Sequence, residues 1–288
     1  LKTFTQWGIA TSFYNAPKLD FSVWSNYLWG LEPERRIDTF LAHGFNRSEF
    51  SDEDGALILE RGGNAAKQLR SYADSVGFSY PQGHLYLRVD ICADGSVDIL
   101  KRWLDMFDTL GIRSAVLHAA GGRELDAERR FAKRAGAIRE LSEYIDGSGM
   151  TICLENQMEE YCPRTSGELN ALIDAAGGKN LGICLDTGHL NVVNNRGVNE
   201  SQSDFISAAG ARLKALHIAD NDGSSDMHLM PYGRGRIDWQ SVMTALAEVG
   251  YDRLYNLEIP GESRAPLEVR ELKLDYIKRM CEYLLSIA

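Results

Sequence analysis

Histidines and carboxylates recur at one kind of position in this 288-residue sequence. Five of the six histidines and four carboxylates lie at or just after the end of a short apolar segment. These nine residues are His84, His118, Glu155, Asp186, His189, His217, Asp226, His228 and Glu258. Four acidic groups buried together without a cation would repel one another and take up protons. The pattern therefore predicts a divalent metal site, and mixed nitrogen and oxygen ligands suit zinc, manganese, cobalt or iron better than calcium.

Two short spacings support this prediction. Asp186 and His189 are three residues apart, so a turn at the end of a strand brings both toward one centre. Asp226 and His228 flank a single residue and point the same way from an extended loop. One such residue alone is more often structural than functional, and a hydrogen-bonded polar rim is the alternative to a metal site.

The elements that must position these residues follow from hydrophobic periodicity. Short apolar segments alternate with amphipathic ones along the chain, as in repeated strand-helix units. The helical pattern is clearest over residues 96–112 and 125–145. We predict eight strands, at residues 7–13, 45–51, 79–87, 114–120, 151–156, 181–189, 214–220 and 255–261.

Eight such units favour one fold, an α/β protein whose single domain, residues 1–288, is a (β/α)8 TIM barrel. An open doubly wound sheet is the alternative, but it more often carries a glycine-rich nucleotide loop after its first strand. The segment after Phe13 has no such loop. Barrel enzymes build their sites at the carboxyl ends of the strands, so the nine residues are expected to converge.

Composition narrows the partners and the compartment. The formal charge of −10 disfavours nucleic acid, whose binding needs clustered Lys and Arg. Five scattered cysteines without a zinc-finger spacing favour a reduced, cytoplasmic protein. No segment approaches the roughly 18 apolar residues of a membrane span, and residues 1–10 lack the core of a signal peptide. The chain begins at Leu1 rather than Met, so the removal of a leader before Leu1 is left as an open alternative.

Five segments resemble, in order and spacing, the xylose-isomerase-like TIM barrel superfamily. This superfamily, also called AP endonuclease family 2, includes endonuclease IV and many sugar isomerases and epimerases. The resemblance runs from about Trp7 to the C-terminus and is strongest from Leu117 to Glu262. The segments are LHAAGG, ICLENQ, LGICLDTGHLN, LKALHIADNDGSSDMHLMPYGRGRIDW and LEIPGE.

The resemblance to the isomerases and epimerases implies one divalent cation, Mn, Zn, Co or Mg, held by Glu155, Asp186, His217 and Glu258. It also implies that Glu155 and Glu258 are an acid-base pair on opposite faces of a bound sugar. The metal would polarise the carbonyl and the adjacent hydroxyl, and a proton would leave and return through an enediolate. His189 would then hydrogen-bond a substrate oxygen.

Endonuclease IV, a phosphodiesterase with three zinc ions, provides the main alternative. Its ligand positions look matched by all nine residues, which implies up to three cations. The negative charge and the absence of a basic loop at the strand ends disfavour it. Arg129, Arg130 and Arg134 alternate with acidic residues, as on a solvated helix face. We therefore expect a sugar isomerase or epimerase, with a multi-zinc phosphodiesterase or a dehydratase on the same barrel as alternatives.

Several residues outside this set are candidate substrate contacts. Trp7, Phe13, Trp24 or Trp29 would supply an apolar wall against a sugar, although core packing is the commoner role of such side chains. Arg234 and Arg236 would grip a sugar hydroxyl or a phosphate, or else structure their loop. Characterised ketose epimerases usually carry an arginine several residues after the histidine of strand seven, where this chain has Gly223, Ser224 and Ser225. The particular sugar and a homo-oligomeric state are left open.

Overall fold

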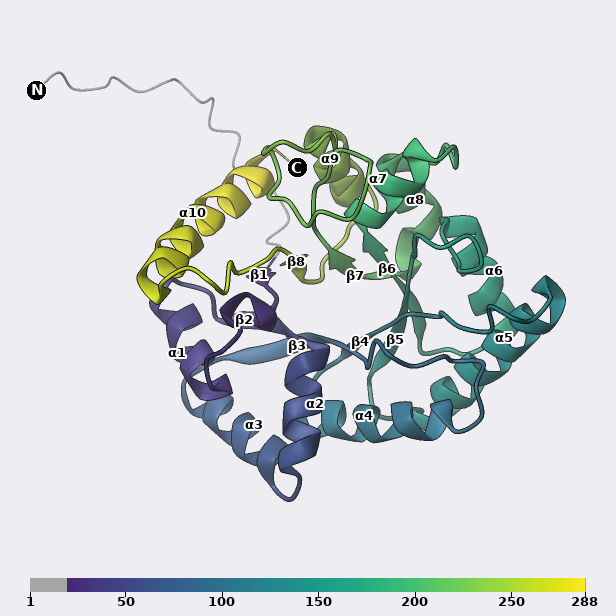
Figure 1. The fold of residues 1–288 in the computed structure, drawn as a ribbon, viewed down its shortest axis with the longest axis horizontal. Coiled ribbons are helices and arrows are strands. Elements are labelled where there is room, and N and C mark those ends of the chain that lie inside the picture. Colours follow the sequence, from purple (N-terminus) through teal and green to yellow (C-terminus); the bar gives the residue numbers. More distant parts are fainter. Residues whose placement is uncertain (1–19, 288) are drawn as a thin grey trace, which may run out of the picture.

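The computed structural model describes residues 20–287, in which eight parallel strands alternate with helices (Figure 1). The strands are β1 (Phe21–Val23), β2 (Arg47–Phe50), β3 (Ser79–His84), β4 (Ser114–Leu117), β5 (Thr151–Glu155), β6 (Leu181–Asp186), β7 (Leu213–His217) and β8 (Tyr255–Leu257). The helices are η1 (Ser25–Leu28), α1 (Pro33–Ala42), α2 (Asp52–Arg61), α3 (Ala65–Ser75), α4 (Ser96–Leu110), α5 (Ala127–Tyr144), α6 (Ser166–Ala176), α7 (Thr187–Asn195), α8 (Gln202–Ala209), η2 (Gly210–Arg212), α9 (Trp239–Glu248) and α10 (Leu267–Ser286).

The strands close into a barrel with the helices around it (Figure 1). Strands β2 to β7 form one parallel sheet in sequence order, and β1 pairs in parallel with β8. The backbone N–H of Ile218 donates to the oxygen of Asn256 over 2.8 Å, which joins the end of β7 to β8. On the other side, the Ser48 hydroxyl donates to the Val23 oxygen over 2.6 Å, between β2 and β1. The predicted (β/α)8 barrel is therefore confirmed.

Seven of the eight predicted strands overlap the observed strands β2 to β8, and the predicted helices 96–112 and 125–145 contain α4 and α5. The predicted strand 7–13 lies outside the described residues. The first described strand is β1, which the sequence pattern does not predict. Because residues 1–19 are not described, the single domain over 1–288 stays a prediction.

The predicted strand 181–189 is wrong at its end. Strand β6 ends at Asp186, and His189 lies in the first turn of α7 instead of after a strand. The reason is local, because a carboxylate of Asp186 accepts the backbone N–H of His189 over 2.7 Å and so caps the helix. His43, the sixth histidine, follows α1 as its C-terminal cap.

The interior of the barrel is layered. The fully buried residues Val116, Cys153, Cys184 and Ala215 form a small apolar cluster apart from the larger core between strands and helices. Side chains alternate between the two faces of a strand, so each of these four lies on the same face as the residue two positions later. Those residues are His118, Glu155, Asp186 and His217. The apolar layer is thus the floor beneath the candidate site.

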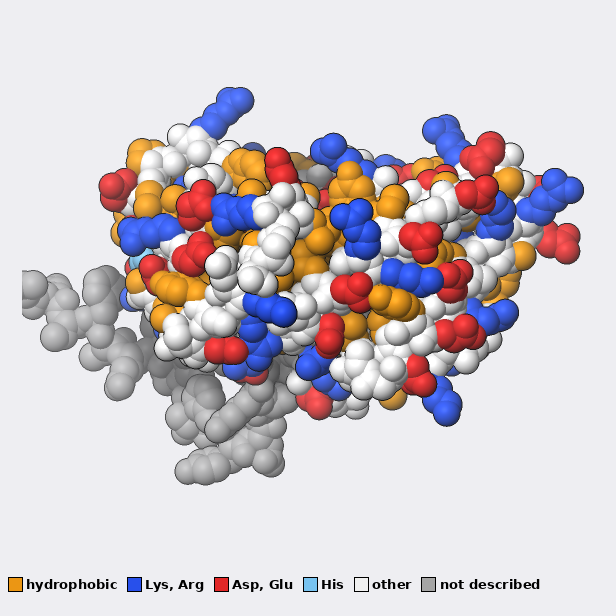
Figure 2. Space-filling model, turned by 90° about the horizontal axis from the view of Figure 1, so that it is seen from below, with side chains coloured by type: hydrophobic (Ala, Val, Ile, Leu, Met, Phe, Trp, Pro, Cys, Tyr) orange, Lys and Arg blue, Asp and Glu red, His pale blue; other side chains and the backbone are white. Residues whose placement is uncertain are grey.

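The outer surface carries charges of both signs. On the face drawn in Figure 2, Lys and Arg side chains are interspersed with Asp, Glu and apolar groups, without one extended basic patch. All five cysteines are buried and unpaired. Within residues 20–287, no helix has the length and apolar character needed to cross a membrane.

Candidate active site

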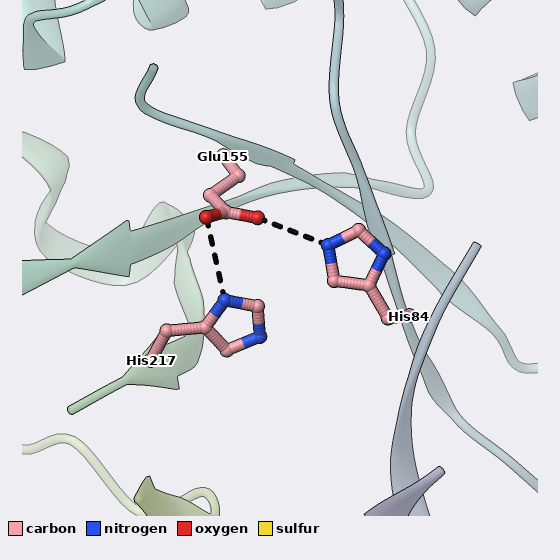
Figure 3. Close-up of side chains that lie close together, drawn as sticks. All are labelled: His84, Glu155 and His217. Atoms are coloured by element: carbon pink, nitrogen blue, oxygen red, sulfur yellow. Dashed lines mark hydrogen bonds and ion pairs between the residues drawn. The ribbon is translucent and has the colours of Figure 1, made fainter. Parts of the chain in front are cut away.

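The carboxylate of Glu155, at the end of β5, lies among four histidines. Its Oε2 atom lies 2.9 Å from Nε2 of His118 and 3.3 Å from Nε2 of His84. Its Oε1 atom lies 3.3 Å from Nδ1 of both His217 and His189. Figure 3 shows the carboxylate between His84 and His217. Burial alone would raise the pKa of Glu155, but His118 and His217 outweigh it and hold this pKa well below its usual value.

Asp186, His217 and Glu258 form a second, overlapping group. Each has one buried atom without a hydrogen-bond partner among residues 20–287, namely Asp186 Oδ2, His217 Nδ1 and Glu258 Oε2. The last two atoms are only 2.8 Å apart, in an orientation that is not a hydrogen bond. One candidate ligand atom from each residue lies within 4.8 Å of the others. Converging, unpartnered oxygen and nitrogen atoms in a buried site fit a divalent cation.

The two groups share His217, so the four predicted metal ligands lie in neighbouring, overlapping groups. Candidate ligand atoms of Glu155, His84 and His217 lie within 4.8 Å of one another, and so do those of Glu155, Asp186 and His189. Among the described residues, the ion-pair partners of Glu155, Asp186 and Glu258 are histidines, and no Lys or Arg is among them. The negative charge of the site is therefore balanced by imidazoles alone, which leaves a place for a cation.

The ionisation of these groups reflects burial and their neighbours. Burial raises the pKa of Asp186 to about 7, although His189 works against the shift. Burial also disfavours the charged form of Glu258, but His217 outweighs it and lowers the pKa to about 2. Burial lowers the pKa of His217, and the surrounding acidic groups reverse this shift and raise it well above the ordinary value.

Asp226 and His228, from the connection between β7 and α9, complete the predicted set. Oδ2 of Asp226 lies 2.7 Å from Nε2 of His228 and 3.5 Å from Nε2 of His189. Trp24 stacks on the His228 ring, with centroids 6.1 Å apart. Burial lowers the pKa of His228, but the hydrogen bond to Asp226 outweighs it and raises the value to about 10. These residues extend the site outward from the four candidate ligands.

The candidate substrate contacts lie at different distances from this centre. Trp24 lies beside His228, whereas Trp29 is half-exposed over the guanidinium of Arg36. Trp7 and Phe13 lie outside the described residues. Arg234 and Arg236 are exposed in the connection between β7 and α9. Substrate contact by Trp7, Arg234 or Arg236 stays a prediction.

A structural role for the loop around Arg236 has direct support. The backbone N–H groups of Arg236 and Ile237 donate to Oδ1 of Asp220, over 3.0 and 3.2 Å. The indole N–H of Trp239 donates to the other oxygen of Asp220 over 2.9 Å. The GRGRIDW segment is thus held by one buried carboxylate at the end of β7, whatever its arginine side chains contact.

Glu49 of β2 is a site residue absent from the predicted set. Its Oε1 atom lies 2.9 Å from Nε2 of His217, and both side chains are almost fully buried. The available signal was a lone acidic residue within the predicted strand 45–51. Because the segment RSEF is polar, its pattern does not show whether the Glu49 side chain points into the barrel or away from it.

Comparisons with known proteins agree with this architecture. A family model described as xylose isomerase-like TIM barrel matches residues 37–282. The L-ribulose 3-epimerase of Mesorhizobium japonicum is 27% identical over 241 residues, which cover 80% of this chain and 76% of that protein. The D-psicose 3-epimerase of Enterocloster bolteae is 24% identical over 249 residues, which cover 80% and 77%. These comparisons confirm that the chain is an enzyme.

Solved structures extend the likeness to almost the whole chain. A D-psicose 3-epimerase with D-tagatose, from Clostridium cellulolyticum H10, has a TM-score of 0.78 at 17% identity, covering 93% of this chain and 99% of that one. An L-ribulose 3-epimerase structure has a TM-score of 0.75 at 20% identity, covering 93% and 95%. At such identities the structural likeness concerns the fold alone. Together with the family match, it shows that this chain belongs to the xylose isomerase-like TIM barrel family.

Proposed function

We propose that this chain is a divalent-metal-dependent sugar isomerase or epimerase that moves a carbon-bound proton between Glu155 and Glu258. The observation that carries the proposal is the set of unpartnered, buried atoms of Asp186, His217 and Glu258 beside the Glu155 carboxylate. Two relatives that align over most of this chain are named as 3-epimerases of L-ribulose and D-psicose. Epimerisation at carbon 3 of a ketose is therefore the reaction that we favour.

The donor atoms of Glu155, Asp186, His217 and Glu258 would hold the cation. When bound, the cation supplies polarisation of the sugar carbonyl and the adjacent hydroxyl, which makes the neighbouring C–H bond more acidic. The abundance of carboxylates suits Mn or Mg, and the histidines suit Zn. The favoured number is one cation per chain.

Two glutamates on different strands suit proton transfer on two faces of a sugar. Glu155 and Glu258 approach the same atom, Nδ1 of His217, from β5 and from the end of β8. Since its pKa is about 2, Glu258 is ionised at neutral pH and is able to accept a proton from carbon. Glu155 contacts the imidazoles of His84 and His118 through Oε2, which provide a route for a proton to and from this carboxylate.

The experiment is proton exchange in heavy water. Protein loaded with Mn, Co or Mg would be incubated with ribulose, psicose, fructose and tagatose, and NMR and mass spectrometry would follow deuterium at carbon and the epimer formed. Glu258→Gln should abolish exchange. Glu262→Gln is the matched control, since Glu262 is half-exposed and pairs with Lys273. Absence of exchange by the wild type with every ketose would count against the proposal.

A multi-zinc phosphodiesterase is the second candidate, and a specific observation favours it. Two potential ligand groups exist besides that of Asp186, His217 and Glu258. One consists of His84, Glu155 and His217, and the other of Glu155, Asp186 and His189. The test is incision of DNA containing an abasic site by zinc-loaded protein. The net charge of −10 disfavours this candidate. A dehydratase would instead be recognised by a product that has lost the mass of one water.

A further inference from the structure

The layer beneath the candidate metal site is apolar on one side of the barrel and polar on the other. On β4 to β7 the layer consists of Val116, Cys153, Cys184 and Ala215. On β8, β1, β2 and β3 it consists of Asn256, Ser22, Glu49 and Gln82, each at most 1% exposed. Burying polar side chains is costly unless they are hydrogen-bonded. The apolar half shows that the barrel can fill this layer without them, so the polar half points to a function.

Glu49 is the centre of this polar half. Its Oε2 atom accepts hydrogen bonds from the amide of Gln82, over 3.0 Å, and from the amide of Asn256. The hydroxyl of Ser22 donates in turn to Oδ1 of Asn256 over 2.7 Å. The Oε1 atom is left to face Nε2 of His217 at 2.9 Å. Because a carboxylate only accepts hydrogen bonds, this contact requires a hydrogen on Nε2 of His217.

The opposite nitrogen of the same ring faces the candidate ligands. Nδ1 of His217 lies 2.8 Å from Oε2 of Glu258 and 3.3 Å from Oε1 of Glu155, and it makes no hydrogen bond within the described part of the chain. A histidine that binds a metal usually donates its other N–H to a carboxylate or a carbonyl, which fixes the tautomer and the ring orientation. Glu49 occupies that position behind His217.

We propose that Glu49 is a positioning residue, which keeps the hydrogen of His217 on Nε2 and so presents the lone pair of Nδ1 to the divalent cation. This inference rests on the metal site of the proposed function. Glu49 itself is held by the amides of Gln82 and Asn256, so its orientation is set by β3 and β8. Through Glu49, the amides of Gln82 and Asn256 therefore serve the metal site above them.

The test compares two variants of the same network. Glu49→Gln should weaken Zn²⁺ affinity by about 10–100-fold, the usual effect of losing such a partner. It should also shift the visible absorption of the Co²⁺-loaded protein, because the ligand field at Nδ1 changes. Ser22→Ala is the matched control, since it removes a buried hydrogen bond of the network that does not touch His217. It should leave Zn²⁺ affinity and the Co²⁺ spectrum unchanged.

Two results with these variants would overturn the proposal. One is wild-type affinity and spectrum in Glu49→Gln, and the other is an equal loss of affinity in Ser22→Ala, which would mark a packing effect. Wild-type protein that binds neither Zn²⁺ nor Co²⁺ would overturn the metal-dependent function as well. Binding by the wild type and equal binding by Glu49→Gln would overturn only the role of Glu49.

A measurement on the wild-type chain covers the case in which Glu49→Gln does not fold. Protein labelled with ¹⁵N at histidine and loaded with Zn²⁺ should show a proton on Nε2 of His217 and none on Nδ1. A proton on Nδ1 in the loaded protein would overturn the proposal.

Discussion

Nδ1 of His228 lies 2.7 Å from the backbone oxygen of Glu258, so the connection between β7 and α9 is hydrogen-bonded to the strand end that carries a proposed acid-base group. Among the residues that the structure describes, His228 belongs to none of the potential ligand groups. We therefore expect His228→Ala to lower kcat by about tenfold or more, in the range of a misplaced catalytic group. Cation affinity should stay unchanged, as measured by calorimetric titration with Mn²⁺.

Loss of the cation in His228→Ala would contradict this expectation. It would place His228 among the ligands, as the three-zinc interpretation requires. His43→Ala is a suitable control, because His43 pairs with Asp275 far along the chain and has no contact with the candidate site.

The number of cations distinguishes the two candidate functions. We expect one per chain in protein purified without chelator, by inductively coupled plasma mass spectrometry. Asp186→Asn should abolish binding, since it removes a charged ligand but retains a side chain that caps helices well. Asp238→Asn, a change at the cap of α9, is the control that should bind normally. Three cations per wild-type chain would favour the phosphodiesterase.

The ion pair between Arg36 and Asp54 should matter for stability rather than chemistry. Both side chains are at most 3% exposed, and Ser25 also donates to the Asp54 carboxylate. Asp54→Ala leaves a buried guanidinium without its partner, which should lower the free energy of unfolding by about 3–5 kcal/mol. In urea titrations, Asp74→Ala at the exposed pair with Arg70 should cost at most about 1 kcal/mol. Equal losses would contradict this difference.

The cysteines provide a check on the folded barrel. All five are buried, and burial raises the pKa of each thiol, that of Cys153 to about 12. The thiolate is the reactive form and its fraction increases with pH, so a raised pKa leaves little of it at pH 8. Native protein should therefore react slowly with iodoacetamide at pH 8, and guanidinium-unfolded protein should react at all five positions. Rapid labelling of native Cys153 would contradict the packing of the barrel floor.

Most of the barrel was predictable because its strands are buried on both faces and its functional residues follow them. Glu155, Asp186, His217 and Glu258 each end or follow a strand, where period-two alternation brings them onto the inner face. The position of His189 was not predictable in the same way. It depends on Asp186 capping α7, whereas the sequence pattern predicts only that Asp186 lies in a strand.

Strand β1 and Glu49 escaped prediction for different reasons. Strand β1 has only three residues, and its pairing with β8 joins segments more than 230 residues apart, which no local pattern reports. Glu49 is one charged residue in a polar strand, and its inward direction follows only from neighbours on β3, β7 and β8. Long-range pairing thus decided both.

The two proposed proton-transfer groups, Glu155 and Glu258, are carried by strands that differ in length and in the number of ladder hydrogen bonds. Glu155 ends a five-residue strand inside the six-stranded ladder, whereas Glu258 follows a three-residue strand at the seam where the barrel closes. Segments with few ladder hydrogen bonds open locally at lower free energy. Amide protons of β8 should accordingly exchange with solvent deuterium sooner than those of β5. Glu155 is thus held by a strand that stays paired, whereas Glu258 follows the strand that opens more readily in local fluctuations of the barrel.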